Sequence, residues 1–216
     1  VEIHREADPA RILEALASGR ISATAMVPTL MAMLLPRVRP GMFPALRRIF
    51  YGGSGIDPDL LRRAIEVFAC DLIQIYAATE TTAALTMLTG QEHRAALDRP
   101  HLLASAGKPG TGAQLRLVTM DGRDAPPGEP GEIWVRSDSV LQGYWRNEAA
   151  TAQALQDRWY RTGDMGRIDD EGYLYVVDRV KDMIITGGEN VYSTEVENAL
   201  AGMPRLREFA VVGVPD

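Results

Sequence analysis

The chain has 216 residues, of which 46% are hydrophobic and 24% are charged, a balance that is typical of a folded globular protein and excludes a disordered chain. Its formal net charge is −6 at pH 7, and basic residues are interspersed with acidic ones, so the sequence predicts no extended surface for nucleic acid.

The first predicted elements are a helix, a strand and a second helix. Asp8 and Pro9 are typical of a helix N-cap and first helical position, and the apolar residues after them follow a helical spacing. Residues 21–27 predict a strand that Pro28 stops, and residues 30–35 predict another helix.

A strand, a turn, a helix and a strand follow. Residues 46–51 predict a strand, residues 52–55 (GGSG) a turn, and Asp57 with Pro58 a helix start; residues 72–76 predict the next strand. Two strands joined by a helix within about thirty residues predict a right-handed crossover in a parallel sheet. This half of the chain is therefore expected to be α/β.

The pattern changes after Gly107, where glycine and proline recur between short alternating runs. Such punctuation predicts antiparallel β structure with tight turns. A helix over residues 148–155 with Asn147 as its cap interrupts it, and residues 169–172 (DDEG) predict a hairpin turn. The three tryptophans are expected to pack in this region.

The last residues predict a strand (183–186), a helix (195–201) and a strand (209–212), which is typical of the start of an α+β unit. Thr194 and Glu197 have the spacing of a capping box for that helix.

Three polar motifs are candidates for ligand binding, and each has a plain structural alternative. The GGSG turn stands before a helix N-terminus, where free N–H groups can meet an anion, but it is equally read as a tight turn. Residues 76–82 (YAATETT) follow a predicted parallel strand, where open α/β sheets bind ligands, or are a polar connection. Asp164 and Arg179 could bind a ribose, or form a surface ion pair.

The ordered combination of motifs is more specific than any one of them. GGSG, QIYAATETT, GEIWVRSDSVLQGYW, YRTGD and DRVKDMIITGGENVYSTEVE occur in this order along the chain. In this order and approximate spacing they resemble the core motifs of the acyl-adenylate-forming (AMP-binding) superfamily. The resemblance covers nearly the whole chain and is strongest to fatty-acyl-CoA synthetases and other acid:CoA ligases.

The resemblance implies the roles of the nucleotide-binding residues. Thr79 would contact the phosphate as part of the catalytic machinery, and Glu80 would bind Mg²⁺. The remaining residues would hold ATP or AMP, with the glycine-rich turn and the tyrosine around adenine and the acid and arginine on the ribose: Gly52, Gly53, Ser54, Tyr76, Asp164 and Arg179.

The resemblance also implies a moving C-terminal part. Lys181 would be the hinge about which a small domain swings between the two half-reactions, and Gly187 and Gly188 would line the channel for the pantetheine of coenzyme A. The implied chemistry needs alignment and charge neutralisation rather than a protein nucleophile.

Several features depart from the family pattern. Ala77 stands where a glycine is usual, and Ser193 where a proline is common. The upstream phosphate loop and the catalytic lysine near the far C-terminus are both missing from the sequence, which begins at Val1 without an initiator Met. We therefore expect an internal fragment that is inactive by itself, because the developing charge on the phosphate loses its main cation.

The expected fold class is α/β. The resemblance implies part of a large N-terminal α/β domain (residues 1–106), a distorted antiparallel β-barrel subdomain (residues 107–178) and the truncated start of a small α+β C-terminal domain (residues 179–216).

The leading functional hypothesis is an ATP-dependent ligase that activates a fatty or related apolar carboxylic acid and transfers it to coenzyme A. The alternatives are a peptide-synthetase-type adenylation domain that loads a carrier protein, and a non-catalytic nucleotide-binding remnant. The single Cys70 and the absence of a transmembrane segment favour a cytoplasmic protein. The sequence does not indicate an oligomeric state.

Overall fold

The computed structural model describes residues 1–3, 5–187, 189–200, 203 and 209–214. Contacts within the chain divide it into two units. The first unit contains residues 1–79 and 83–110, and the second contains residues 80–82 and 111–216. The chain therefore passes into the second unit at Glu80, returns to the first at Ala83, and passes to the second again after Gly110.

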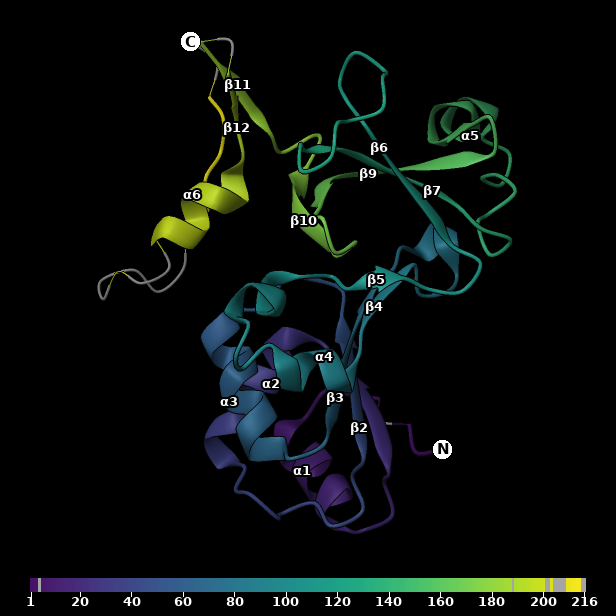
Figure 1. Ribbon diagram of the computed structural model, residues 1–216. Helices are drawn as coiled ribbons and strands as arrows, with labels where there is room; N and C mark the ends of the chain where they lie inside the picture. Colours follow the sequence, from purple (N-terminus) through teal and green to yellow (C-terminus); the bar gives the residue numbers. More distant parts are fainter. Residues whose placement is uncertain (4, 188, 201–202, 204–208, 215–216) are drawn as a thin grey trace. The chain divides into compact units, whose positions relative to one another are not determined.

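The first unit is built on a five-stranded sheet (Figure 1). Its order is β1 (Ala23–Met26), β2 (Arg48–Gly52), β3 (Asp71–Tyr76), β4 (Thr86–Leu88) and β5 (Lys108–Pro109). The first three strands are parallel, whereas β4 and β5 are antiparallel to their neighbours. The predicted parallel sheet is confirmed, and β4 and β5 extend it with strands that the sequence did not predict.

Four α-helices belong to this unit: α1 (Pro9–Ala17), α2 (Pro28–Leu34), α3 (Pro58–Phe68) and α4 (Gly90–Ala95). Two short 3-10 turns, η1 (Leu35–Arg37) and η3 (Pro100–Ala104), accompany them, and a third, η2 (Thr79–Thr81), begins in this unit and continues into the second. As predicted, the Asp8 and Asp57 carboxylates accept backbone N–H bonds at the starts of α1 and α3. Pro28 ends a strand because it opens α2.

The two faces of this sheet differ in burial. Alternate residues of a strand point to opposite faces. Ile49, Tyr51 and Leu72 are at most 2% exposed and point towards the helices, which Figure 1 shows on one side of the sheet. On the other face Ile73 and Ile75 are only half-buried, so this face is the less covered one within the described residues.

The second unit contains the predicted antiparallel β structure. Its sheet has the order β10 (Leu174–Arg179), β9 (Trp159–Ile168), β7 (Gly131–Arg136), β6 (Gln114–Val118), with β8 (Leu155–Gln156) paired to β9. The helix α5 (Glu148–Ala154) begins at the predicted cap, Asn147. Gly172 closes the β9–β10 turn with a positive φ and an N–H bond to the Asp169 carbonyl.

The C-terminal residues form β11 (Ile184–Thr186), β12 (Glu189–Val191) and α6 (Ser193–Leu200). The strand predicted over residues 209–212 is wrong, because the Val211 N–H donates to the Glu197 carboxylate at 2.9 Å rather than to a neighbouring strand. The expected capping box of Thr194 and Glu197 is also wrong, because α6 begins one residue before Thr194. The described capping box is instead at Thr89 and Glu92, at the start of α4.

The fold class is thus α/β with several sheets, as predicted, and the division into three domains stays a prediction. Trp134 is buried as expected, but Trp145 is 86% exposed. In the part of the chain that the structure describes, no helix has both the length and the hydropathy to cross a membrane.

Candidate functional site

The glycine-rich turn lies at the carboxyl end of β2. Gly52 approaches the next strand so closely that a Cβ atom there would lie 2.2 Å from the Ile75 carbonyl oxygen. Gly53 has a φ of +86°, which favours glycine. With Ser54 it is exposed in the loop that leads to Asp57, the N-cap of α3. The sequence therefore forms an open backbone loop between a strand end and a helix start.

Tyr76 ends β3, the strand next to β2. The two strands are parallel, and Gly52 pairs in register with Ile75. Parallel strands end at the same edge of a sheet, so the structure brings Tyr76 and the glycine-rich turn together at the edge where α/β sheets bind ligands. Thr79 follows in η2 and is exposed.

Glu80 is the next residue of the chain but belongs to the second unit. Its carbonyl oxygen accepts the Leu141 N–H at 2.7 Å, and its carboxylate Oε1 accepts the Tyr144 hydroxyl at 2.8 Å. Both partners lie between β7 and α5. The predicted site residues are therefore divided: the glycine-rich turn, Tyr76 and Thr79 lie in the first unit, and Glu80 and the remainder lie in the second.

Asp164 and Arg179 face one another across β9 and β10. They are paired in register, and Arg179 Nε lies 3.6 Å from Asp164 Oδ1. The Asp164 side chain is 21% exposed and that of Arg179 is 62% exposed, so the guanidinium is in contact with solvent. The two residues predicted to bind ribose are therefore neighbours, and they form an ion pair with each other, which was the structural alternative for them.

Tyr160, on β9, lies near the carboxylates of both Glu80 and Asp164. Burial raises the pKa of its phenol above the ordinary value of 10, and Glu80, Tyr144 and Asp164 raise it further. The pKa of Tyr144 is raised chiefly by its hydrogen bond to Glu80. Glu80 and Asp164 therefore both lie near the Tyr160 phenol, in one region of the second unit.

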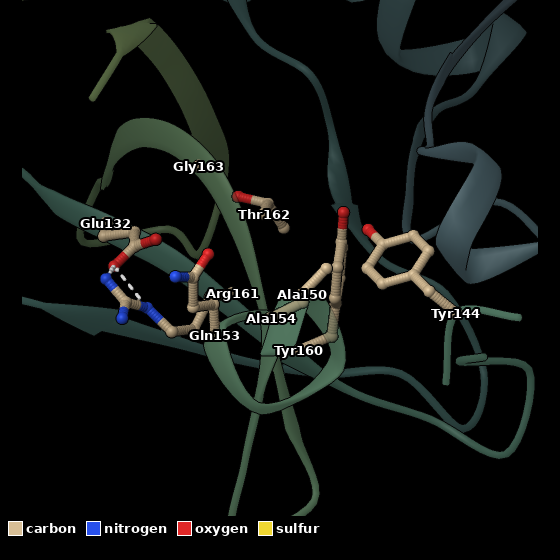
Figure 2. A pocket seen from close by; sticks show the side chains of 9 residues that line it. All are labelled: Glu132, Tyr144, Ala150, Gln153, Ala154, Tyr160, Arg161, Thr162 and Gly163. Carbon is tan, nitrogen blue, oxygen red and sulfur yellow. Dashed lines mark hydrogen bonds and ion pairs between the residues drawn. The ribbon is translucent and has the colours of Figure 1, made fainter. Parts of the chain in front are cut away.

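The two tyrosines line an open pocket of about 530 Å³ (Figure 2). Figure 2 shows their phenol oxygens directed to the same end of the pocket. At the opposite end Arg161 donates to Glu132 Oε2 from Nη2 at 3.0 Å, and Trp134 Nε1 donates to the same oxygen at 2.9 Å. The carboxylate of Glu132 is satisfied, which explains how this residue is tolerated at 8% exposure.

The predicted hinge and channel residues lie beyond β10. Lys181 is exposed in a turn in which the Asp182 and Met183 N–H groups both donate to the Arg179 carbonyl. Gly187, with a φ of +60°, begins the turn between β11 and β12. Gly188 lies outside the described residues.

The carboxylate of Glu80 is suited to a metal ion that is bound together with a phosphate-bearing ligand. Within the described residues, no three His, Cys, Asp or Glu side chains gather as a metal site. Proteins commonly hold Mg²⁺ through one or two carboxylates while substrate phosphates and waters complete its shell. The single carboxylate of Glu80 therefore fits a magnesium ion that is bound together with a phosphate-bearing ligand.

Tyr144 and Tyr160 were not predicted as site residues. Both stand inside recognised motifs, QGYW and YRTGD, but nothing local indicates that Tyr144 contacts a carboxylate 64 positions earlier. Only the three-dimensional pairing of the two segments identifies them.

Comparisons with known proteins identify the family of this chain. A family model described as "AMP-binding enzyme" matches residues 1–145. The chain is 38% identical over 221 residues to a feruloyl-CoA synthase of Amycolatopsis sp, covering 100% of this chain and 43% of that protein. It is 38% identical over 198 residues to the fatty acid–[acyl-carrier-protein] ligase ScoC of Streptomyces coeruleorubidus, covering 91% of this chain and 38% of that protein.

Solved structures also match. The O-succinylbenzoate coenzyme A synthetase (MenE) of Bacillus subtilis, in complex with ATP and a magnesium ion, superimposes with a TM-score of 0.87 at 32% identity. The match covers 99% of this chain and 43% of that one. The chain thus spans about two fifths of the length of the proteins it matches.

Proposed function

The chain belongs to the AMP-binding enzyme family, and from that membership we propose that the protein carrying it activates a carboxylic acid with ATP and transfers the acyl group to coenzyme A. The observation that supports this most directly is that motif residues far apart in the sequence lie close together in the fold. The glycine-rich turn and Tyr76 share one sheet edge, and Glu80 and Asp164 share one region of the second unit.

We propose that ATP is the nucleotide and that each predicted residue holds one part of it. Gly52, Gly53 and Ser54 would border the adenine, because an open backbone loop admits a flat ring. Tyr76 would stack on that ring. This assignment is supported by the shared edge of β2 and β3.

For the sugar and phosphates, Asp164 would accept the ribose hydroxyls and Arg179 would donate beside it. Thr79 would hydrogen-bond a phosphate oxygen, and Glu80 would bind the Mg²⁺ that accompanies ATP. The magnesium ion supplies neutralising charge on the phosphates. The solved MenE complex with ATP and magnesium supports this choice of ligand.

The proposed chemistry uses positioning. A carboxylate that attacks the α-phosphate is repelled by the negative charge of ATP, so the site must neutralise that charge and hold the reactants in line. Glu80 would help to neutralise that charge by holding the Mg²⁺ ion, and Arg179 would do so with its own positive charge. The chain needs to offer no nucleophile, and Cys70 is a poor one, since burial and then Asp71 raise its pKa to about 11.

Transfer to the thiol needs a second arrangement of the site. We propose that the backbone at Lys181 turns between the two arrangements and that Gly187 and Gly188 then border the pantetheine arm. The exposure of Lys181 in a turn after β10 supports this role.

The acid is proposed to be apolar, either an aromatic acid or a fatty acid. The relatives support both, because one is named a feruloyl-CoA synthase and the other a fatty acid ligase. The second relative also supports the alternative acceptor, a carrier protein, since it is named as a ligase for an acyl-carrier protein. We propose a cytoplasmic enzyme, and we infer that these 216 residues alone form little acyl-adenylate.

An acid panel tests this function on the protein as its gene encodes it. Aromatic, fatty and amino acids are incubated with ATP, Mg²⁺ and coenzyme A, and AMP and thioester are measured separately. Apolar acids that yield both products support the proposal. Adenylate without thioester, which a phosphopantetheinylated carrier protein then accepts, supports the alternative, and nucleotide binding without turnover contradicts both.

A further inference from the structure

Glu80 is held at both its backbone and its carboxylate by one loop of the second unit. The Leu141 N–H donates to its carbonyl oxygen at 2.7 Å, and the Tyr144 hydroxyl donates to Oε1 at 2.8 Å. The η2 turn has only three residues, so it offers little packing of its own to fix this side chain. The loop partners, together with the Tyr160 hydroxyl, therefore decide where the carboxylate points.

Tyr144 is itself fixed by the helix that follows it. Its backbone N–H donates to Thr151 Oγ1 at 2.9 Å, and Thr151 Oγ1 donates to the Asn147 carbonyl at 2.8 Å. Asn147 in turn caps α5. A chain of hydrogen bonds therefore connects the first turn of α5 to the carboxylate of Glu80.

The geometry points to Tyr144 as a positioning residue that orients the Glu80 carboxylate for Mg²⁺ of the bound nucleotide, an inference that rests on the function proposed above. The Tyr144 phenol holds Oε1 at 2.8 Å and so fixes the direction in which the carboxylate faces. Tyr160 lies at the same end of the pocket as Tyr144 (Figure 2), and its hydroxyl also hydrogen-bonds Glu80. Hydrogen-bonded partners of this kind set the direction of a ligating carboxylate, and their loss commonly lowers metal affinity 10- to 100-fold.

The variant Tyr144→Phe removes only the hydroxyl. In the protein as its gene encodes it, we measure Mn²⁺ affinity from the electron paramagnetic resonance of free Mn²⁺, with the protein in excess over ATP so that nearly all ATP is protein-bound, and with Mn²⁺ standing in for Mg²⁺. The expected result is a loss of about 10-fold in Mn²⁺ affinity. The affinity for AMP measured in EDTA should stay within about twofold, because the phenol acts on the metal and not on the nucleotide.

A matched control and a double mutant separate positioning from general structure. Tyr175→Phe removes a phenol-to-carboxylate hydrogen bond of 3.0 Å, to Asp169 at the β9–β10 turn, and should leave Mn²⁺ affinity unchanged. Glu80→Gln should lower Mn²⁺ affinity by itself. In the Glu80→Gln background, Tyr144→Phe should add no further loss, since residues that act as one unit are not additive.

Three outcomes decide the matter. If Tyr144→Phe keeps wild-type Mn²⁺ affinity, or if its loss persists undiminished with Glu80→Gln, Tyr144 does not act through Glu80. If Tyr144→Phe unfolds the protein, Thr151→Val, which removes the support of Tyr144, must produce the same selective metal defect. If the wild type itself binds no Mn²⁺ with ATP, the proposed function fails rather than the role of Tyr144.

Discussion

Tyr51 and His93 form a buried polar pair beneath the first sheet. His93 Nδ1 lies 2.8 Å from the Thr89 carbonyl, which can only accept, so Nδ1 carries the hydrogen and Nε2 accepts from the Tyr51 hydroxyl at 2.7 Å. Both ring nitrogens are satisfied in the neutral form. Burial lowers the pKa of His93, although the Thr89 bond and Glu92 act in the opposite direction.

This pair predicts a loss of stability in mild acid. Below the ordinary histidine pKa of 6.5 the unfolded chain binds a proton that the folded chain resists, so the free energy of unfolding should fall as pH falls from about 6.5. Urea unfolding between pH 5 and pH 8 measures the slope. His93→Gln should flatten the slope in this range, and an unchanged slope would assign the acid sensitivity to other groups.

Gly52 predicts a second effect at a single residue. Gly52→Ala would force a Cβ against the Ile75 carbonyl oxygen, and overpacking of this kind costs about 1–3 kcal/mol in unfolding free energy. Gly55→Ala is the matched control, because a Cβ there meets nothing within 4 Å, and its effect should stay within about 0.5 kcal/mol. Equal effects of the two variants in urea unfolding would contradict the close approach.

At the scale of elements, a row of side chains crosses the antiparallel sheet of the second unit. Arg116 on β6, Trp134 on β7 and Arg161 on β9 are neighbours in register. The two guanidinium carbons lie 5.7 and 5.4 Å from the ring centroid of Trp134. Glu132 accepts from both Trp134 and Arg161, so the row ties three strands together.

Breaking this row at Arg161 should destabilise the sheet. Arg161→Met leaves the mostly buried Glu132 with the Trp134 N–H as its described partner, and a buried acceptor that loses a charged donor costs about 1–3 kcal/mol. Arg116→Met removes an exposed pair with Asp124 and should cost less than about 1 kcal/mol. Thermal unfolding compares them, and adding Glu132→Gln to Arg161→Met should recover part of the loss.

Elements with local signals were predictable, and those that depend on distant pairing were not. The helix starts at Asp8, Asp57 and Asn147 were predicted because a cap and its N–H partner lie within three residues. β4 is only three residues long and exists because it pairs with β3 and β5. For the same reason the motifs indicated Glu80 and Asp164, whereas Tyr144 and Tyr160 emerged only from the folded chain.

At the scale of the whole molecule, β10 leads into a solvent-exposed turn. Lys181 lies in that turn between β10 and the β11–β12 hairpin. Rotation of the backbone there would move everything that follows residue 181, and it would exchange the hydrogen bonds of Ser193 to the Asp178 carboxylate for other contacts. The proposed two-step chemistry depends on this freedom.

Lys181→Pro tests that freedom, because proline fixes φ at one residue. We expect acyl-adenylate formation, measured by pyrophosphate exchange, to change by less than about threefold, and thioester formation to fall by more than about tenfold. Asp170→Pro is the control, since it places proline at the second position of a tight turn, where proline is favoured. Equal losses in both half-reactions would argue against a hinge at Lys181.

Residues 80–82 interrupt the first unit in sequence but belong to the second, and this affects recombination between related genes. A recombination event between two homologous genes at residues 110–111 would pair the Glu80 turn of one parent with the Leu141 and Tyr144 loop of the other. Hybrids should therefore inherit function only when the parents agree at both segments, so these two segments must evolve in step although they lie far apart in the sequence.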